Sequence, residues 1–440
     1  MVTRDSSSRT AIWSLGRKWI PTALGSSLLA WEIPVVVAIV ARTSDGPTAV
    51  AAFGAGLSVL VVVNAPALAL APLVVLTMSK HGSRTLWKYA FAVGLFGTAL
   101  IVLLALTPLT TNALGIPTEL HGPLSICLLS FGLAPLAVAL RRCQHGHLIS
   151  SGRTSVIAHA TILRMLGTVA AVVALWQAGL PSAAVGGLAL TVGAWIEVTR
   201  LGWTVRRSAT SPRPESEVWP GSENLFATHL RLSSTVALNM LPALATTVLI
   251  ARAVDAETAL IIWPVLYALV SLITVPLSDL EVVGSSHLTS GGDSTTVFGL
   301  TVMIAASLVI LGAVTVASPV IHFYLTVANG LSQQLTETAY PWVVVLAAIP
   351  PLWAVRGYVR SLVLASGWTK FLVYSASMHI GGMTVSGCVL LTAGLPGLAS
   401  AAFAMLTAIV AEIAFMYYLV VRRQRRDLFP RTHPAQQERL

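Results

Sequence analysis

Five ionisable side chains lie within long apolar stretches of this sequence: Glu32, Arg164, Glu197, His379 and Glu412. An ionisable group at the centre of a hydrocarbon layer is costly unless it is paired, protonated or hydrated, so such groups mark ion or proton pathways. Carboxylates and an imidazole can also bind a proton or a small cation and release it again. We therefore expect these residues to bind and release a proton or a cation, or to pair with each other. The surrounding helices must position them.

Two of these residues are predicted to meet across a helical hairpin in each half of the chain. Arg164 and Glu197 flank the turn at 179–181, each about sixteen residues from its centre, and at about 1.5 Å per residue they reach the same depth. His379 and Glu412 repeat this arrangement around the matching Gly-Leu-Pro turn of the second half. The sequence therefore predicts two pairs, each with one basic and one acidic side chain.

The predicted pairs have two interpretations. They could neutralise buried charge and hold each hairpin together, because an unpaired buried charge is far costlier than a matched one. They could also bind and release a proton during a conformational cycle. Arginine keeps its charge at any biological pH, whereas histidine titrates near neutral pH. The second interpretation therefore favours His379 with Glu412 over Arg164 with Glu197.

Glu32 lies close to Pro34 in the first apolar stretch. A proline inside a helix removes a backbone hydrogen bond and bends the helix, which frees a carbonyl group beside the acid. Glu32 is therefore a candidate for binding a coupling proton or cation. The alternative is a neutral glutamic acid that is hydrogen-bonded to a neighbouring helix.

The composition places these residues in a membrane. Of 440 residues, 55% are hydrophobic and 10% are charged, and the mean hydropathy is +0.79, which is far from the composition of water-soluble domains. A helix needs about 20 apolar residues to cross about 30 Å of hydrocarbon, and a backbone in lipid must satisfy its own polar groups. The sequence thus predicts an all-α integral membrane protein. The twelve predicted spans are 19–41, 49–78, 89–108, 123–140, 156–176, 183–205, 232–251, 258–280, 296–318, 338–355, 371–392 and 398–421.

The basic residues predict the orientation of these spans. Lys and Arg are concentrated in alternate loops and in both terminal segments, and such loops face the cytoplasm. We therefore expect a multi-pass protein of the cell membrane with both termini in the cytoplasm. The net charge of +10 follows from this topology, so no nucleic-acid partner is expected.

The two halves of the chain are repeats. Residues 141–207 align with 356–422 at a constant offset of 215, and Arg42 matches Arg252 at an offset of 210. Six spans in each half make the repeats parallel, and two such lobes enclose a central cavity. The predicted parts are an N-lobe at 1–207, a cytoplasmic linker at 208–230, a C-lobe at 231–421 and a basic cytoplasmic tail at 422–440.

Other polar and aromatic residues within spans are candidates for the cavity wall. Asn64 could line the cavity or bond across a helix interface, where small polar groups are common. Trp263, Tyr267 and Trp353 could contact an amphipathic substrate or anchor their helices. Glu281 ends the eighth span without a basic residue in the following loop, so it is expected to be solvated.

No motif for catalysis or for a metal is present. The sequence has no Walker loop, no HExxH helix and no nucleophile elbow. Its three cysteines form no CxxC pair. We expect neither an enzyme nor a cofactor, apart from H⁺ or Na⁺ as a coupling ion.

The loop after the fourth span of each half carries a resemblance to a known family. Residues 141–154 and 356–369 share an Arg, Ser-Gly and Thr pattern, and Pro21 is followed by Ala41-Arg42 in the first span. This pattern resembles the multidrug and toxic compound extrusion (MATE) family. That family belongs to a flippase superfamily (MOP) with the lipid-linked oligosaccharide exporters and the progressive ankylosis proteins. Where many MATE members carry a cation-binding Asp, this chain has Val36, one turn after Glu32.

The resemblance implies a secondary active transporter. We expect a MATE-like exporter of an amphipathic small molecule, coupled to H⁺ or Na⁺ by alternating access, and acting as a monomer in contact with membrane lipid. One alternative is a flippase of lipid-linked glycans or glycolipids from the same superfamily, which Arg164 would favour. A membrane scaffold without transport is the other.

Overall fold

The computed structural model describes residues 3–208 and 224–428, and this part of the chain is helical without any strand. The first half contains α1 (Thr3–Ala30), α2 (Glu32–Val40), α3 (Gly46–Val63), α4 (Ala65–Leu68), α5 (Leu70–Leu106), α6 (Leu109–Leu114), η1 (Thr118–Leu120), α7 (His121–Ser130), α8 (Ala134–Ser150), α9 (Thr154–Gln177) and α10 (Ser182–Ser208). The second half contains α11 (Leu225–Ala251), α12 (Ala256–Leu277), α13 (Asp279–Thr289), α14 (Ser294–Ala317), α15 (Val320–Phe323), η2 (Tyr324–Ala328), α16 (Gln333–Leu346), α17 (Ile349–Ala365), α18 (Thr369–Thr392) and α19 (Gly397–Leu428).

These helices confirm the predicted all-α membrane fold. Eleven segments of the described chain are long and apolar enough to cross a membrane. The twelfth predicted span is α18, which packs along α19 as α9 packs along α10. The protein is therefore a multi-pass membrane protein. Residues 209–223 of the predicted linker and 429–440 of the predicted tail lie outside the described residues, and α11 already begins within the predicted linker.

The first span is broken where the sequence placed a bend. Helix α1 ends at Ala30 and α2 begins at Glu32, with Trp31 between them. Pro34 has no N–H group to donate to the Ala30 carbonyl, so the regular i to i−4 hydrogen bond cannot form at this point. The break lets the two parts of the span follow different directions, and it places Glu32 in the first turn of α2.

The repeat is visible in the helix hairpins. Helices α8, α9 and α10 correspond to α17, α18 and α19, and matching glycines end the first two helices of each set. Gly152 and Gly367 have φ values of 70° and 71°, and Gly179 and Gly394 have φ values of 67° and 79°. A side chain at such positive φ is strained, so glycine fixes the same turns in both halves.

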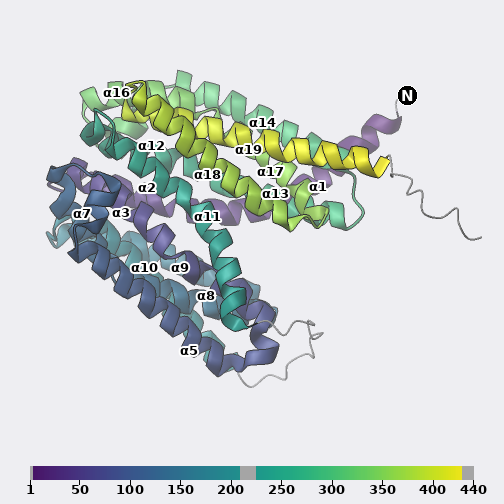
Figure 1. The fold of residues 1–440 in the computed structure, drawn as a ribbon, viewed down its shortest axis with the longest axis horizontal. Helices are drawn as coiled ribbons and strands as arrows, with labels where there is room; N and C mark the ends of the chain where they lie inside the picture. Colours follow the sequence, from purple (N-terminus) through teal and green to yellow (C-terminus); the bar gives the residue numbers. More distant parts are fainter. Residues whose placement is uncertain (1–2, 209–223, 429–440) are drawn as a thin grey trace, which may run out of the picture.

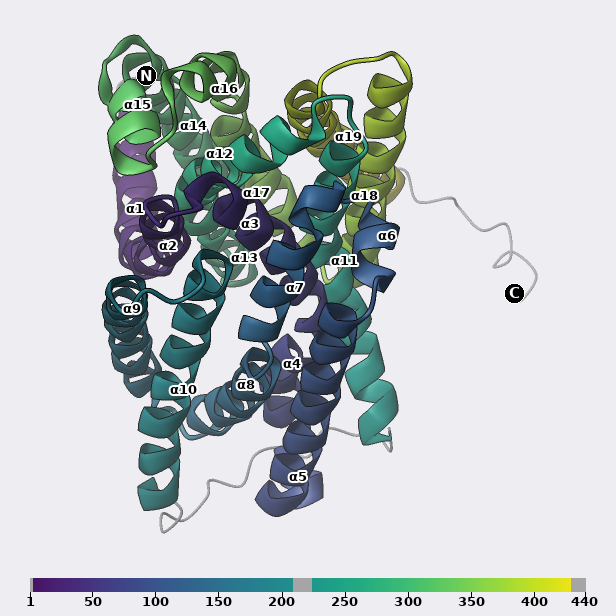
Figure 2. The ribbon, with the colours of Figure 1, turned by 90° about the vertical axis from the view of Figure 1, so that its left-hand side faces the viewer.

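Two helices cross from one lobe to the other. Helix α1 packs on α12, α13 and α14 of the second half, whereas α2 packs on α9 and α10 of its own half and also on α12. Helix α11 contacts α3, α4 and α5 of the first half as well as α18 and α19. In Figure 2, α2 and α3 lie between the C-lobe helix α12 and the N-lobe helices α9 and α10. Helices α1 and α11 therefore each contact the lobe formed by the other half of the chain.

The apolar core differs between the two ends of the bundle. At the end opposite to the termini, one large cluster joins both lobes, from Val40 and Phe53 to Leu260 and Ile262. At the end that carries the termini, the basic end, each lobe has a separate core. One surrounds Leu73 in the N-lobe and the other surrounds Leu300 in the C-lobe. The two groups of helices diverge toward the basic end (Figure 1).

Candidate functional site

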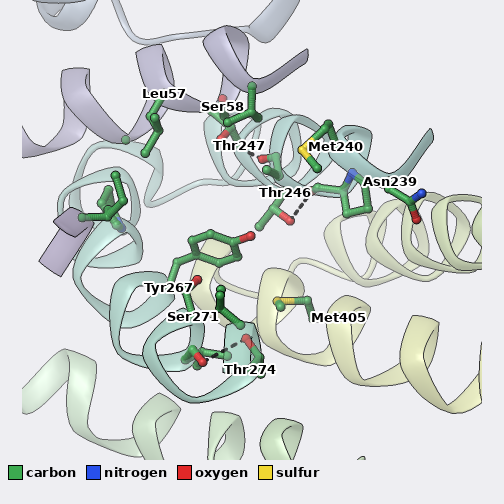
Figure 3. A pocket seen from close by; sticks show the side chains of 18 of the residues that line it. Leu57, Ser58, Asn239, Met240, Thr246, Thr247, Tyr267, Ser271, Thr274 and Met405 are labelled. Carbon is green, nitrogen blue, oxygen red and sulfur yellow. Dashed lines mark hydrogen bonds between the residues drawn. The ribbon is translucent and has the colours of Figure 1, made fainter. Parts of the chain in front are cut away.

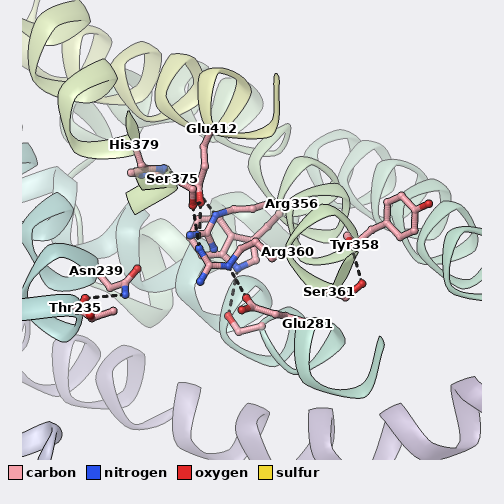
Figure 4. Close-up of polar contacts among 12 residues, drawn as sticks. Thr235, Asn239, Glu281, Arg356, Tyr358, Arg360, Ser361, Ser375, His379 and Glu412 are labelled. Atoms are coloured by element: carbon pink, nitrogen blue, oxygen red, sulfur yellow. Dashed lines mark hydrogen bonds and ion pairs between the residues drawn. The ribbon is translucent and has the colours of Figure 1, made fainter. Parts of the chain in front are cut away.

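The C-lobe holds a buried cluster of charges around Glu412 on α19. The carboxylate is fully buried and accepts hydrogen bonds from groups on α17 and α18. The donor atoms are Arg356 Nε at 2.7 Å, His379 Nδ1 at 2.9 Å, Ser375 Oγ at 2.9 Å and Arg360 Nη1 at 3.2 Å (Figure 4). We call these residues, together with Glu281, the C-lobe cluster.

Helix geometry explains how this cluster assembles. Arg356 and Arg360 are four residues apart on α17, so they project from the same face toward α19. Arg360 also bonds to Glu281 on α13, with 2.6 Å between Nε and Oε2. The charges of two arginines and two glutamates therefore balance within the cluster, as a buried set of charges requires.

The N-lobe repeats this cluster around Glu197 on α10. Its fully buried carboxylate lies 2.8 Å from Arg141 Nη1, 3.0 Å from His145 Nε2 and 3.7 Å from Arg164 Nη1. Arg164 bonds more closely to Glu32, through Nη2 and through Nε at 3.1 Å. The N-lobe cluster consists of Glu32, Arg141, His145, Thr161, Arg164, Thr168 and Glu197.

The predicted contacts within each hairpin are present. His379 bonds directly to Glu412, and Arg164 lies within ion-pair distance of Glu197. The stronger partner of Arg164 is nevertheless Glu32, which Thr168 Oγ1 also approaches to 2.8 Å. The spacing along the sequence predicted the depth of these groups in the membrane. It did not predict that α2, which carries Glu32, faces α9, which carries Arg164.

Sequence reasoning missed four basic members of the clusters, as well as the hydroxyl groups of Thr161, Thr168 and Ser375. Arg141, His145, Arg356 and Arg360 were assigned to basic loops, but they lie within helices α8 and α17 and their side chains point into the protein. The repeat offered a sign, since Arg141 and Arg356 match at the same offset as the two glutamates.

The expectation that Glu281 is solvated is wrong. Its side chain is 17% exposed and pairs with Arg360. The basic partner comes from α17 rather than from the loop that follows Glu281. A search for nearby basic residues along the sequence could not find it.

A cavity of about 340 Å³ lies between the lobes (Figure 3). Helices α2 and α3 contribute one wall, and α11, α12, α17, α18 and α19 contribute the rest. Its wall is mainly apolar, with scattered hydroxyl and amide groups such as Ser58, Asn239 and Thr246. A volume of this size accommodates a drug-sized molecule.

Some of the predicted residues line this cavity and others do not. His379 and the aromatic residues Trp263, Tyr267 and Trp353 are part of the wall. Asn64 is not; it is buried at the junction of α3 and α4, so of its two predicted positions the structure favours the helix interface. Glu32, Arg164, Glu197 and Glu412 also lie outside the lining.

A pair of arginines connects the lobes at the end opposite to the basic end. Arg42, after α2, donates to the Val327 and Ala328 carbonyls at the end of η2, with 2.5 Å to Ala328. Arg252, after α11, donates to the Ala113 and Leu114 carbonyls of α6 at 2.8 and 3.1 Å. Each arginine thus caps a short helix of the other half, where carbonyl groups lack helical partners.

We call the contacts of Arg42 and Arg252 with the other half the arginine clasps, and the repeat relates them. Arg42 matches Arg252, and Ala113 matches Ala328. Together with the shared apolar cluster, they join the lobes at this end of the molecule. The cavity lies beyond them, toward the end where the lobes have separate cores.

Known proteins resemble this chain in fold but not detectably in sequence. No protein-family model matches the sequence, and no curated protein matches it. A multidrug resistance MATE family transporter of the MOP superfamily, in its inward-facing conformation, superposes with a TM-score of 0.65 at 10% identity, over 90% of this chain and 94% of that chain. The lipid II flippase MurJ, in an inward closed conformation, superposes with a TM-score of 0.65 at 13% identity, over 92% of this chain and 87% of that chain.

The chain has the fold of the MOP superfamily. The predicted resemblance is confirmed at the level of fold, while the progressive ankylosis branch stays a prediction. An outward-facing MATE transporter superposes less well, with a TM-score of 0.58 at 12% identity over 94% of this chain and 96% of that chain.

The donor set around each buried glutamate does not suit a metal ion. Among the described residues, no group of three or more His, Cys, Asp or Glu side chains could hold one. Glu197 and Glu412 face mainly nitrogen donors of arginine and histidine. Those donors occupy the oxygen atoms that a cation would need. In this fold, each buried glutamate is therefore held by hydrogen bonds and ion pairs to basic side chains.

Proposed function

We propose that this protein is a secondary active transporter that exports an amphipathic small molecule by alternating access and is coupled to the proton gradient. The basic end would face the cytoplasm of a cell, in keeping with the concentration of Lys and Arg there. The cavity would then receive substrate from the cytoplasmic side. The MOP fold, which transporters of the MATE family share, supports this proposal.

The observation that carries the proposal is the position of the cavity between two differently packed ends. At the end opposite to the basic end, which would be the outer end, the lobes share one apolar cluster and two arginine clasps. At the basic end, which would be the inner end, the lobes have separate cores. Rocking the lobes about the middle would open the outer end and close the inner one, which is the alternating-access movement.

His379 is the group best placed for proton coupling. It lines the cavity, and its Nδ1 bonds to the buried Glu412. A proton on the imidazole adds one positive charge to an otherwise balanced cluster, so the two protonation states differ in energy between lobe arrangements. Of the predicted coupling residues, His379 and Glu412 thus form one unit at the cavity.

Glu32 has a different setting. Its carboxylate is held by Arg164 and Thr168 and does not line the cavity. The charges of Glu32 and Arg164 match, and removing either leaves the other buried without its partner. This supports a structural role at the break between α1 and α2. Proton coupling would therefore lie in the C-lobe cluster, at His379 and Glu412.

Cavity size bears on the alternatives. A volume of about 340 Å³ suits a small molecule better than the headgroup of a lipid-linked glycan with several sugars. A scaffold without transport has no need for a cavity with a titratable wall. Export of a small molecule therefore remains the better-supported function.

Proteoliposomes that contain a pH-sensitive dye would test the proposal. A panel of amphipathic dyes of either charge is added under an imposed pH gradient, and substrate-dependent proton flux is measured. We expect flux with the wild type and its loss in His379→Gln. His145→Gln is the matched control, because His145 belongs to the N-lobe cluster and does not line the cavity.

Two results would contradict the proposal. One is the absence of proton flux with every dye, even though the protein is folded. The other is an equal loss of flux in His145→Gln and His379→Gln, since this would assign both histidines to stability alone.

A further inference from the structure

The cavity wall is charged in one sense only. Two of its residues, Arg356 and His379, are basic, and none of the residues that line it is an Asp or Glu. Glu412 lies behind them and is fully buried. A molecule in the cavity therefore meets the cationic side of the C-lobe cluster, while the balancing carboxylate is screened from it.

Glu412 and Trp353 hold the guanidinium group of Arg356 and leave its two terminal nitrogens, Nη1 and Nη2, available. Its Nε donates to Glu412 at 2.7 Å, and its Cζ lies 4.4 Å from the centre of the Trp353 ring. Within the described part of the chain, no hydrogen bond engages Nη1 or Nη2, and the residue lines the cavity. Two parallel N–H donors on a fixed guanidinium match the two oxygens of a carboxylate, sulfonate or phosphate.

The repeat shows that this exposure is specific to one lobe. Arg141 occupies the position that corresponds to Arg356, but its Nη1 donates to Glu197 and the residue does not line the cavity. The architecture thus does not require a cation at the cavity wall. Only the C-lobe presents one.

The aromatic residues of the wall do not form a site for a cation. Cations bind over the face of an aromatic ring, but the guanidinium of Arg356 already stacks on Trp353. Trp263 and Tyr267 pack against each other, with 6.1 Å between ring centroids. Their planes are tilted by 34°, and together with Met240 and Met405 they form an aromatic and apolar part of the wall that suits a ring system.

We propose that the substrate is an amphipathic anion, with a planar or fused-ring body against Trp263 and Tyr267 and its acidic group on Arg356. This inference rests on the proposed transport function and adds the substrate class. Arg356 is then the residue that determines specificity for charge. A cationic molecule of the same shape is repelled by Arg356 and finds no carboxylate in the wall.

Two dyes with the same xanthene ring system test this inference. Purified full-length protein in lipid nanodiscs is titrated with fluorescein, an anion, and with rhodamine 123, a cation, and binding is followed by fluorescence anisotropy. We expect fluorescein to bind at least about tenfold more tightly, in line with a charge-assisted hydrogen bond. Equal or tighter binding of rhodamine 123 would overturn the inference.

Variants locate the effect. Arg356→Gln should weaken fluorescein binding by roughly 10- to 100-fold, whereas Arg356→Lys should keep part of it. Arg141→Gln is the matched control and should bind as the wild type does. Unchanged binding in a folded Arg356→Gln protein would refute the role of Arg356.

A competition experiment on the wild type keeps the test decisive if Arg356→Gln does not fold. 2-Naphthoate should displace bound fluorescein, and 2-naphthylmethylammonium should not. The reverse order would overturn the inference. Binding is measured without a gradient, so it is independent of transport. If fluorescein binds but is not transported, the transport proposal is contradicted, whereas the preference of the cavity for an anion stands.

Discussion

The two lobes contain the same buried acid but distribute histidine and arginine differently around it. Glu197 and Glu412 occupy matching positions and are both fully buried. In the N-lobe the histidine is on the fourth span, as His145, and the fifth span carries Arg164. In the C-lobe this order is reversed, with Arg360 and His379.

This exchange determines what each lobe can do. The fifth span of the C-lobe presents an imidazole, His379, to the cavity. The fifth span of the N-lobe carries a permanent charge, which Glu32 neutralises. One architecture thus presents a histidine to the cavity from one lobe and holds the matching arginine in an ion pair in the other lobe. Duplication supplied the geometry, and divergence at two positions supplied the asymmetry.

Removal of the shared acid should have the largest effect. Glu412→Gln leaves Arg356 and Arg360 without their buried carboxylate, and Glu197→Gln does the same to Arg141. We expect each change to lower the free energy of unfolding by about 3–5 kcal/mol, measured by denaturant titration in detergent. A change at the exposed Glu257 should stay within about 0.5 kcal/mol. A loss in only one lobe would show that the clusters are not equivalent in stability.

The asymmetry can be removed by giving the C-lobe the arginine of the N-lobe. His379→Arg places a permanent charge beside Glu412 and adds one unbalanced positive charge to the C-lobe cluster, so the variant should be less stable than the wild type. The folded variant should lose the dependence of transport on pH, with proton-coupled flux at least about tenfold lower. Flux measured in proteoliposomes between pH 6 and 8 checks this. A variant that keeps the pH profile of the wild type would argue against His379 as the coupling group.

The arginine clasps should act equally, because the repeat relates them. Arg42→Ala and Arg252→Ala each remove hydrogen bonds to exposed helix ends, at a cost of about 1 kcal/mol to the closed outer end. Each should shift the population toward the outward-open form by roughly fivefold. Spin labels on both lobes at the basic end, measured by double electron–electron resonance, should report shorter distances. Distances that do not change would show that the apolar cluster alone closes the outer end.

The smallest effect is expected at the matched turns. Gly152 and Gly367 have positive φ, and nothing lies within 4 Å of a Cβ built at either position. An alanine there would meet only backbone strain, so both variants should lose about 1 kcal/mol of stability. Thermal unfolding of the two variants checks this. A clear difference between them would mean that the two turns have diverged in their surroundings.

Helix spacing predicted part of the candidate site correctly. The contact between His379 and Glu412 followed from their equal distance to one turn, since helical rise converts residue number into depth. The same argument brought Arg164 near Glu197 but could not reveal Glu32, which lies on a helix far away in the sequence. The partner of a buried charge depends on how helices are arranged around each other, and spacing along one hairpin does not contain this.

The sequence by itself determined the solvent, the number of spans and the repeat. These properties depend on local composition and on matching residues, and a hydrocarbon layer leaves a backbone little choice except helix. Only the tertiary structure decided that Arg356 and His379 face the cavity, that Asn64 does not, and that α1 and α11 cross between the lobes. Those features depend on the rotation and packing of helices distant in sequence, and membrane helices pack through contacts that hydropathy does not encode.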